Sequence, residues 1–258
     1  RIIRINGDGS IRMIYSGVTP PTESTKVIKT TDTSLGNSSF NNSSTSAEFV
    51  GYKYTIKEQH GTSKSSDIKT FLDNWYANYT DFSKTGTKLT DQIFCNDRTV
   101  STSAVVYSKE NYTTLTNWAS TGTQYYYGAY GRIVKDNNPM LTCAVDSDRF
   151  TVNKINGKGN SALTYPVGLI TADEVAMAGG KNGTGNSTYY LYTNQSYWSG
   201  SPSYFASSGT ALEFDVYSPG RLYNGSVRYT YGVRPVVSLS SKAKLSHSGT
   251  YNDVYTVS

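Results

Sequence analysis

Residues 197–239 read YWSGSPSYFASSGTALEFDVYSPGRLYNGSVRYTYGVRPVVSL, and this stretch carries the clearest strand pattern of the chain. From 212 to 217, apolar and polar side chains alternate, which predicts a strand with one face in the core and the other in solvent. The expected inward residues are Leu212, Phe214 and Val216, and the expected solvent-facing residues are Glu213, Asp215 and Tyr217. A turn at 218–220 and a strand from 221 to 223 should follow. The apolar run 232–239 predicts another strand, which Pro235 places at a sheet edge or a bulge.

Two helices are predicted before this stretch. Residues 66–79 place apolar side chains on one stripe of a 3.6-residue period, and Ser66 can cap the first turn. A second helix begins at Thr171, which forms a capping box with Glu174, and ends at Gly179-Gly180. The apolar residues 167–170 before it predict a strand.

The beginning of the chain predicts a β-hairpin. Apolar residues alternate with charged ones on both sides of the turn signal at 6–9, Asn-Gly-Asp-Gly. Residues 18–50 are rich in Pro, Ser, Thr and Asn and predict a loop insertion. Strands and helices of this kind indicate an α+β fold, and we expect residues 1–258 to form a single domain. Because the chain begins at Arg1 inside an alternating segment, we expect an anchor or export segment to precede it.

Composition excludes several classes of protein. The net charge of +5 is spread along the chain without a basic block, so nucleic acid is not an expected partner. No stretch reaches the ~20 apolar residues of a membrane span, so a membrane would be reached only through a preceding anchor. The 23 tyrosines are the unusual feature of the composition.

The two cysteines, Cys95 and Cys143, do not form a CxxC motif. One interpretation is a disulfide in an exported protein, which the chain-entropy treatment credits with roughly 4 kcal/mol. The alternative is two buried free thiols.

Catalytic patterns are weak in this sequence. His60 and His247 are the chain's two histidines, and both lie in polar, loop-like contexts. Carboxylate pairs such as Asp146/Asp148 and Glu213/Asp215 suit a solvated strand edge as well as acid–base chemistry. The glycines at 179–185 follow a helix instead of opening one, so they do not predict a phosphate site. We therefore expect no catalytic residues, no metal ligands and no cofactor.

Several blocks of the chain resemble a known group of proteins. FCNDR (94–98), DRFTV (148–152), YPVGLITADEVAMAGG (165–180) and GVRPVVSL (232–239) are similar to blocks in surface proteins of Firmicutes and their relatives, which often follow a prepilin-like anchor. The order of the second half also resembles the C-type-lectin-like fold of formylglycine-generating-enzyme-like domains and of the variable proteins of diversity-generating retroelements. Trp198 and Gly232-Val233-Arg234 occupy the positions that mark this fold, although the closing strand departs from Gly-Phe-Arg-Leu.

The resemblance implies a C-type-lectin-like fold with two main helices, a twisted antiparallel sheet and long loops. It also implies that the terminal strands pair, here the hairpin at Arg1 with a strand near Val254. Ligand-facing positions would lie between Trp198 and Gly232. This segment is rich in Tyr, Ser, Gly and Asn, the residue types that are enriched in adaptable recognition surfaces. The candidate ligand-binding residues are Tyr197, Tyr204, Phe205, Tyr217, Tyr223, Asn224, Arg228, Tyr229 and Tyr231. The alternative is that these tyrosines occur only because tyrosine favours β-strands, without a role in binding.

These observations favour a non-enzymatic, exported and monomeric ligand-binding domain at the cell surface. Its expected partner is a protein or glycan on another cell or on a host, and the resemblance raises the hypothesis that a retroelement diversifies the tyrosine-rich stretch. A structural subunit of a pilus tip or cell surface is the alternative. A carboxylate-based hydrolase is a third hypothesis.

Overall fold

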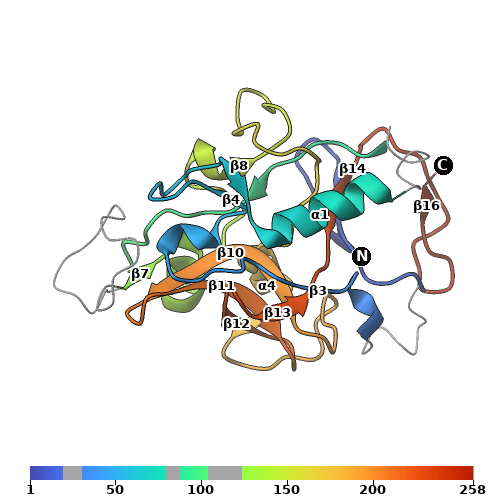
Figure 1. Cartoon of the computed structure of the whole chain (residues 1–258). Coiled ribbons are helices and arrows are strands. Elements are labelled where there is room, and N and C mark those ends of the chain that lie inside the picture. The colour runs from blue at the N-terminus through green and yellow to red at the C-terminus, as the bar shows by residue number, and fades with distance from the viewer. Residues whose placement is uncertain (20–30, 80–87, 104–123, 258) are drawn as a thin grey trace.

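One open, mixed sheet dominates an α+β fold. The computed structural model describes residues 1–19, 31–79, 88–103 and 124–257 (Figure 1). Within them the sheet has seven strands in the order β3-β13-β10-β11-β12-β9, with β7 paired to β10. These strands are β3 Asn37–Ser39, β7 Tyr125–Tyr126, β9 Lys181–Asn182, β10 Tyr197–Ala206, β11 Thr210–Tyr217, β12 Arg221–Ser226 and β13 Thr230–Gly232.

Three long antiparallel strands form the centre of this sheet. β11 pairs with β10 on one side and with β12 on the other, so the strands predicted at 212–217 and 221–223 are confirmed. Gly220, with φ of 87°, takes the left-handed conformation in the turn between β11 and β12. At the flanks, β13 runs parallel to β10 and β9 runs parallel to β12.

The solvent face predicted for β11 is wrong for Glu213 and Asp215, whereas Tyr217 is exposed as predicted. Glu213 and Asp215 are both fully buried, whereas Leu212 is only partly buried. The reason is that β11 is a central strand and that the 3₁₀ turn η3 (Ala47–Val50) packs against it. Alternation indicates a wet face only where one side of a strand remains open.

A second sheet of three strands places the N-terminal hairpin beside a late strand of the chain. Its order is β1-β2-β14, with β1 at Ile2–Ile5, β2 at Ile11–Ile14 and β14 at Val236–Leu239. The N-terminal hairpin is confirmed, and β14 begins directly after Pro235 at the edge of this sheet. The expected pairing of the hairpin with the segment near Val254 is wrong. That segment leads into β16 (Thr256–Val257), which pairs with β15 (Leu245–Ser246).

Both predicted helices are present. α1 spans Asp67–Asn78 and packs against β3, and the Ser66 hydroxyl accepts a hydrogen bond from the Lys69 amide at 3.3 Å (Figure 1). α4 spans Ala172–Met177 and has the complete capping box of Thr171 and Glu174. The strand expected at 167–170 is reduced to a single bridge between Gly168 and Val236, although its apolar side chains are buried.

A third helical segment was not predicted. α3 (Gly128–Tyr130) continues into the π turn η5 (Gly131–Lys135). A Cβ atom at Gly128 would lie 2.3 Å from Asp97 Oδ2, and one at Gly131 would lie 2.1 Å from Ser101 Oγ. These glycines therefore allow close packing in a segment that glycine composition alone marks as a loop.

Part of the stretch 18–50 belongs to the sheet and the core. β3 pairs with β13, Phe40 and Val50 are fully buried, and a 3₁₀ turn, η2, lies at Thr31–Thr33. Residues 20–30 lie outside the described part of the chain. None of the described helices is long and apolar enough to cross a membrane.

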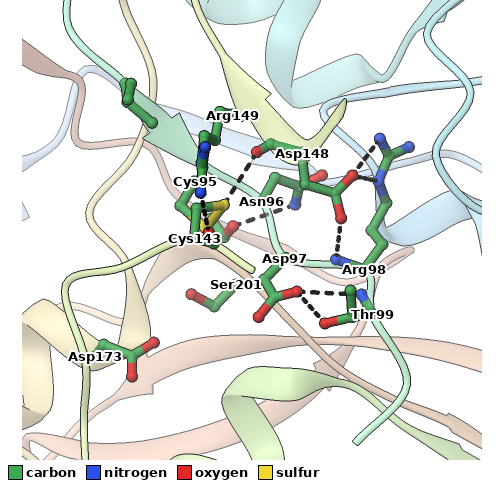
Figure 2. The surroundings of a disulfide bond; sticks show 12 residues. Cys95, Asn96, Asp97, Arg98, Thr99, Cys143, Asp148, Arg149, Asp173 and Ser201 are labelled. Carbon is green, nitrogen blue, oxygen red and sulfur yellow. Dashed lines mark hydrogen bonds and ion pairs between the residues drawn. A yellow bond between two sulfur atoms is a disulfide. The ribbon is translucent and has the colours of Figure 1, made fainter. Parts of the chain in front are cut away.

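The disulfide between Cys95 and Cys143 is confirmed, so the alternative of two free thiols is wrong. The Cα atoms are 5.6 Å apart, and Cys95 lies on β6 (Phe94–Cys95), which pairs with β8 (Arg149–Phe150). Figure 2 shows Asp148 beside this bridge, at the end of the 3₁₀ turn η6 (Asp146–Asp148). A further two-stranded pair is formed by β4 (Lys53–Tyr54) and β5 (Lys64–Ser65).

Buried charges around the disulfide are paired. Asp148 Oδ1 is 2.7 Å from the Nη2 of Arg98, and both side chains are almost completely buried. The Arg132 guanidinium binds Asp97 at 2.7 Å and Asp173 at 2.9 Å. Removal of one partner from such a buried pair is destabilising, because it leaves an unpaired buried charge.

Candidate ligand-binding face

Four tyrosines gather on one part of the large sheet and form what we call the tyrosine face. They are Tyr217, Tyr223, Tyr229 and Tyr231, contributed by β11, by β12, by the turn after β12 and by β13. The first three expose 39%, 44% and 57% of their surfaces, and Tyr231 is partly exposed. Exposed aromatic rings held on strands offer a large contact area at low cost in conformational entropy.

Arg221 holds one half of this face in place. It lies opposite Tyr217 in the β11–β12 register, so both side chains leave the same side of the sheet. Its guanidinium carbon is 5.2 Å from the Tyr217 ring centroid and 4.6 Å from the Tyr223 ring centroid. Cation–π contact on two rings fixes a planar cation between two aromatic side chains.

Trp198 supports the other half from below. Its ring centroid lies 4.7 Å from that of Tyr231, which in turn lies 6.2 Å from Tyr229. The indole nitrogen donates to the Ser38 carbonyl at 2.8 Å, so β3 fixes the orientation of the ring. Trp198 itself is fully buried, and its ring packs beneath Tyr231.

Gly225 makes this close packing possible. It lies on β12, and a Cβ atom there would come 2.8 Å from the Tyr231 ring and 2.9 Å from Asp215 Oδ2. Both approaches are shorter than van der Waals contact. A larger residue at 225 would therefore push Tyr231 or Asp215 out of position.

Asp215 lies beneath the tyrosine face without a hydrogen-bond partner. Its two carboxylate oxygens are buried and unpaired, and it pairs in the sheet with Trp198 and Tyr223. Burial raises the pKa of Asp215 to about 7, although the charge of Arg221 lowers it. The acid therefore changes its charge near neutral pH. Burial and the Asp215 charge together raise the pKa of Tyr231 to about 12.

Glu213 is the second unpaired acid, and it lies deeper. It is two residues from Asp215 on the same side of β11, and both of its oxygens lack a hydrogen-bond partner. Burial raises the pKa of Glu213 well above its ordinary value, and Arg98 opposes the shift. Burial of this kind favours the neutral form of the carboxyl group, because a charge without a hydrogen-bond partner is costly away from water. Neither acid reaches solvent, so in this conformation a substrate or water molecule cannot contact them.

Two of the predicted binding residues are buried and cannot contact a ligand. Tyr197 and Phe205 lie on β10 with no exposed surface. The Arg234 guanidinium packs on the Tyr197 ring at 4.6 Å, and Phe205 lies 6.5 Å from the Tyr125 ring. Both belong to the core because β10 is covered on both faces.

The three remaining candidates lie apart from the described ring contacts of the tyrosine face. Tyr204 is half-buried and packs with Tyr126 and Tyr130, each at 5.7 Å between ring centroids. Asn224 is partly buried, and its side-chain oxygen accepts a hydrogen bond from Ser203. Arg228 is exposed in the turn between β12 and β13, beside Tyr229 in the sequence.

Sequence reasoning missed Arg221 and Asp215 as part of this face. Arg221 follows the turn at 218–220, and pairing across that turn places it opposite Tyr217. The register of the hairpin is therefore the signal that could have found it. For Asp215, the sequence contains no sign of the cover that removes it from water.

No family model, curated protein or solved structure matches this chain. The histidines lie elsewhere: His60 contacts Asp148 at 3.0 Å, and His247 contacts Asp253 at 2.7 Å. Across the described ranges, no group of three or more His, Cys, Asp or Glu side chains is placed to hold a metal ion. The geometry of the tyrosine face is suited to contact, through exposed rings around a fixed guanidinium.

Proposed function

We propose that this protein is a non-enzymatic, ligand-binding domain that contacts a protein or glycan through the tyrosine face. The observation that carries the proposal is the cluster of exposed rings at Tyr217, Tyr223 and Tyr229, fixed by Arg221 and supported by Trp198. Tyrosine and arginine are enriched at binding hot spots, and rigid rings lose little entropy on binding.

The finer fold assignment is also a proposal. A C-type-lectin-like fold is supported by the pairing of Tyr197 with Gly232, which brings the Trp198 block beside the Gly232-Val233-Arg234 block. It is further supported by the sheet that joins β2 to β14. Export to the cell surface is supported by the disulfide, which persists in oxidising compartments.

Removal of the exposed rings tests the binding proposal. The probe is a fluorescently labelled sample of this chain applied to a glycan array and to an array of host surface proteins. We expect substitution of Tyr217, Tyr223 and Tyr229 by Ala to abolish the signals that the unchanged protein gives. Tyr251→Ala with Tyr255→Ala is the matched control, since these tyrosines are exposed elsewhere on the chain. Equal loss in the control, or no loss in the triple variant, would reject the face.

A structural subunit is the second candidate, because exposed rings can also pack against a neighbouring copy. The test is analytical ultracentrifugation over a range of concentrations. A monomer at every concentration supports a ligand-binding domain, whereas assembly that the triple Ala variant removes supports a structural role.

Retroelement diversification is tested separately, by searching the gene neighbourhood for a reverse transcriptase beside a near-repeat of the coding sequence for 197–234.

A further inference from the structure

We propose that a charged cavity beside the disulfide binds a small ligand through an oxyanion, independently of the tyrosine face. The cavity has a volume of about 280 Å³. It is enclosed by the turn of the N-terminal hairpin, by residues 140–143 and by the start of α4. None of its lining residues belongs to the tyrosine face. This volume is slightly below the roughly 300–1,000 Å³ of drug-sized ligand pockets, so the cavity suits a small ligand.

The carboxylates that line the cavity already have their partners. Asp173 receives two parallel hydrogen bonds from Arg132, at 2.9 and 3.0 Å, and the third guanidinium nitrogen donates to Asp97 at 2.7 Å. Glu174 is held at 2.7 Å by the Nε of Arg12. Figure 2 shows Asp97, Asp173 and Ser201 around the disulfide. Acceptors that are saturated in this way do not attract a cation.

Donors in the same cavity remain unused. Arg149 donates through Nη1 to Asp146 at 3.2 Å and through Nη2 to the Cys143 carbonyl at 2.8 Å, which leaves Nε without a described partner. Arg4 binds Glu174 through Nε and Asn6 through Nη1, which leaves Nη2. Lys158 is exposed, and within the described ranges its ammonium group has no partner.

This imbalance defines the ligand. Guanidinium and ammonium groups offer only donors, and their strongest partners are carboxylate, sulfate and phosphate oxygens. The pair of Arg149 with Asp146 lies at the surface, where Asp146 is 47% exposed, so an entering oxyanion can compete for Arg149. The oxyanion can be an inorganic ion or a group on an acidic sugar. Both sources share the same recognition chemistry.

Titration of the whole chain with three probes tests the site. The probes are sodium sulfate, sodium glucuronate and uncharged glucose, followed by amide chemical shifts in NMR at low ionic strength. We expect an oxyanion to shift the amides of Thr142 and Lys158, and glucose to shift neither. Equal affinity for sulfate and glucuronate identifies the oxyanion alone as the ligand, whereas tighter glucuronate binding identifies an acidic sugar. No shift with either anion at millimolar concentration overturns the proposal.

Two lysines of one loop provide a matched comparison. Lys158 lines the cavity, whereas Lys154 is also exposed but does not line it. We expect Lys158→Gln to weaken anion binding about fivefold, as for loss of one exposed charge contact, and Lys158→Arg to restore it. Lys154→Gln and Tyr223→Ala should leave the affinity unchanged. Equal weakening by Lys154→Gln would show a diffuse charge effect and would also overturn the site.

Discussion

Two buried glutamates show how differently this fold treats the same side chain. Glu174 lies at the start of α4 and is bound by two arginines, Arg12 at 2.7 Å and Arg4 at 3.0 Å. Glu213, in the middle of β11, is equally buried and has no hydrogen-bond partner. Burial alone would raise the pKa of both. The arginines instead lower the pKa of Glu174, whereas the pKa of Glu213 stays well above its ordinary value.

This difference separates two kinds of buried acid. Around the disulfide, each buried aspartate forms an ion pair with an arginine, so its charge stabilises the fold. These aspartates are Asp97, Asp148 and Asp173. Beneath the tyrosine face, Glu213 and Asp215 have no hydrogen-bond partner, and burial raises the pKa of both. Removing the charge of a paired acid is expected to lower the stability of the protein. Removing the charge of an unpaired acid is expected to raise the stability at a pH above the pKa of that acid.

The largest effect is expected from breaking a paired acid. Asp148→Asn removes the charge opposite Arg98 and leaves a buried guanidinium without compensation. We expect the free energy of unfolding to fall by about 3 to 5 kcal/mol. Urea denaturation at pH 7 measures this fall, and Asp136→Asn, at an exposed carboxylate, is the control. A loss below ~1 kcal/mol, the typical value of a surface pair, would remove the distinction between the two kinds of acid.

Opening the disulfide tests whether the paired region depends on its crosslink. Replacing Cys95 and Cys143 by Ala frees a loop whose ends are 48 residues apart. We expect a loss of about 4 kcal/mol in the free energy of unfolding, the value that the chain-entropy treatment gives for a loop of this size. The same urea experiment, repeated on the unchanged protein with reductant, should give a similar value. An unchanged midpoint would mean that the charge network holds this region without the bridge.

Neutralising an unpaired acid should stabilise the protein at high pH. Between the unfolded pKa of ~3.9 and the folded pKa of about 7, native Asp215 keeps a proton that the unfolded chain has lost. The contribution of Asp215 to the free energy of unfolding is therefore fully present below pH 4, and it is lost as the pH rises to 7. Asp215→Asn keeps a neutral side chain at every pH.

We expect Asp215→Asn to be more stable than the unchanged protein at pH 8 by about 2 kcal/mol. This is roughly half of the full shift, because the amide also lacks partners. The difference should shrink as the pH falls toward 5. Unfolding in urea at pH 5, 6, 7 and 8 follows this trend, and a constant difference across the range would contradict the raised pKa.

The smallest effect is expected at the surface of the tyrosine face. Tyr229 is 57% exposed, so Tyr229→Ala should change the free energy of unfolding by no more than ~0.5 kcal/mol. Phe205→Ala, in the core beside the same sheet, should cost about 3 to 5 kcal/mol. Thermal unfolding of the two variants gives the comparison. Similar losses would mean that Tyr229 is part of the framework and is not held available for a ligand.

Local signals in the sequence predicted much of the fold. Ser66 and the Thr171/Glu174 pair fix helix starts because a cap satisfies amides within the same turn. The hairpin follows from the turn residues at 6–9, and the disulfide was one of two interpretations of Cys95 and Cys143. Each of these features depends on chemistry within a short segment or on a single pair.

Features that depend on distant cover were not predictable. Tyr197 and Tyr217 occur in the same tyrosine-rich stretch, yet Tyr197 is buried under Arg234 and Tyr217 lies at the surface. The burial of Asp215 depends on the neighbouring strands, which place Trp198 and Tyr231 against it. A single sequence does not show which face of a central strand another segment will cover.

The small sheet has a consequence for the time at which the fold can form. Arg234 Nε donates to the Tyr15 carbonyl, 219 residues earlier in the chain, and β14 pairs with β2. Contacts of such separation form slowly because a long loop must close first. During synthesis the N-terminal hairpin therefore lacks its third strand until residues 236–239 have left the ribosome.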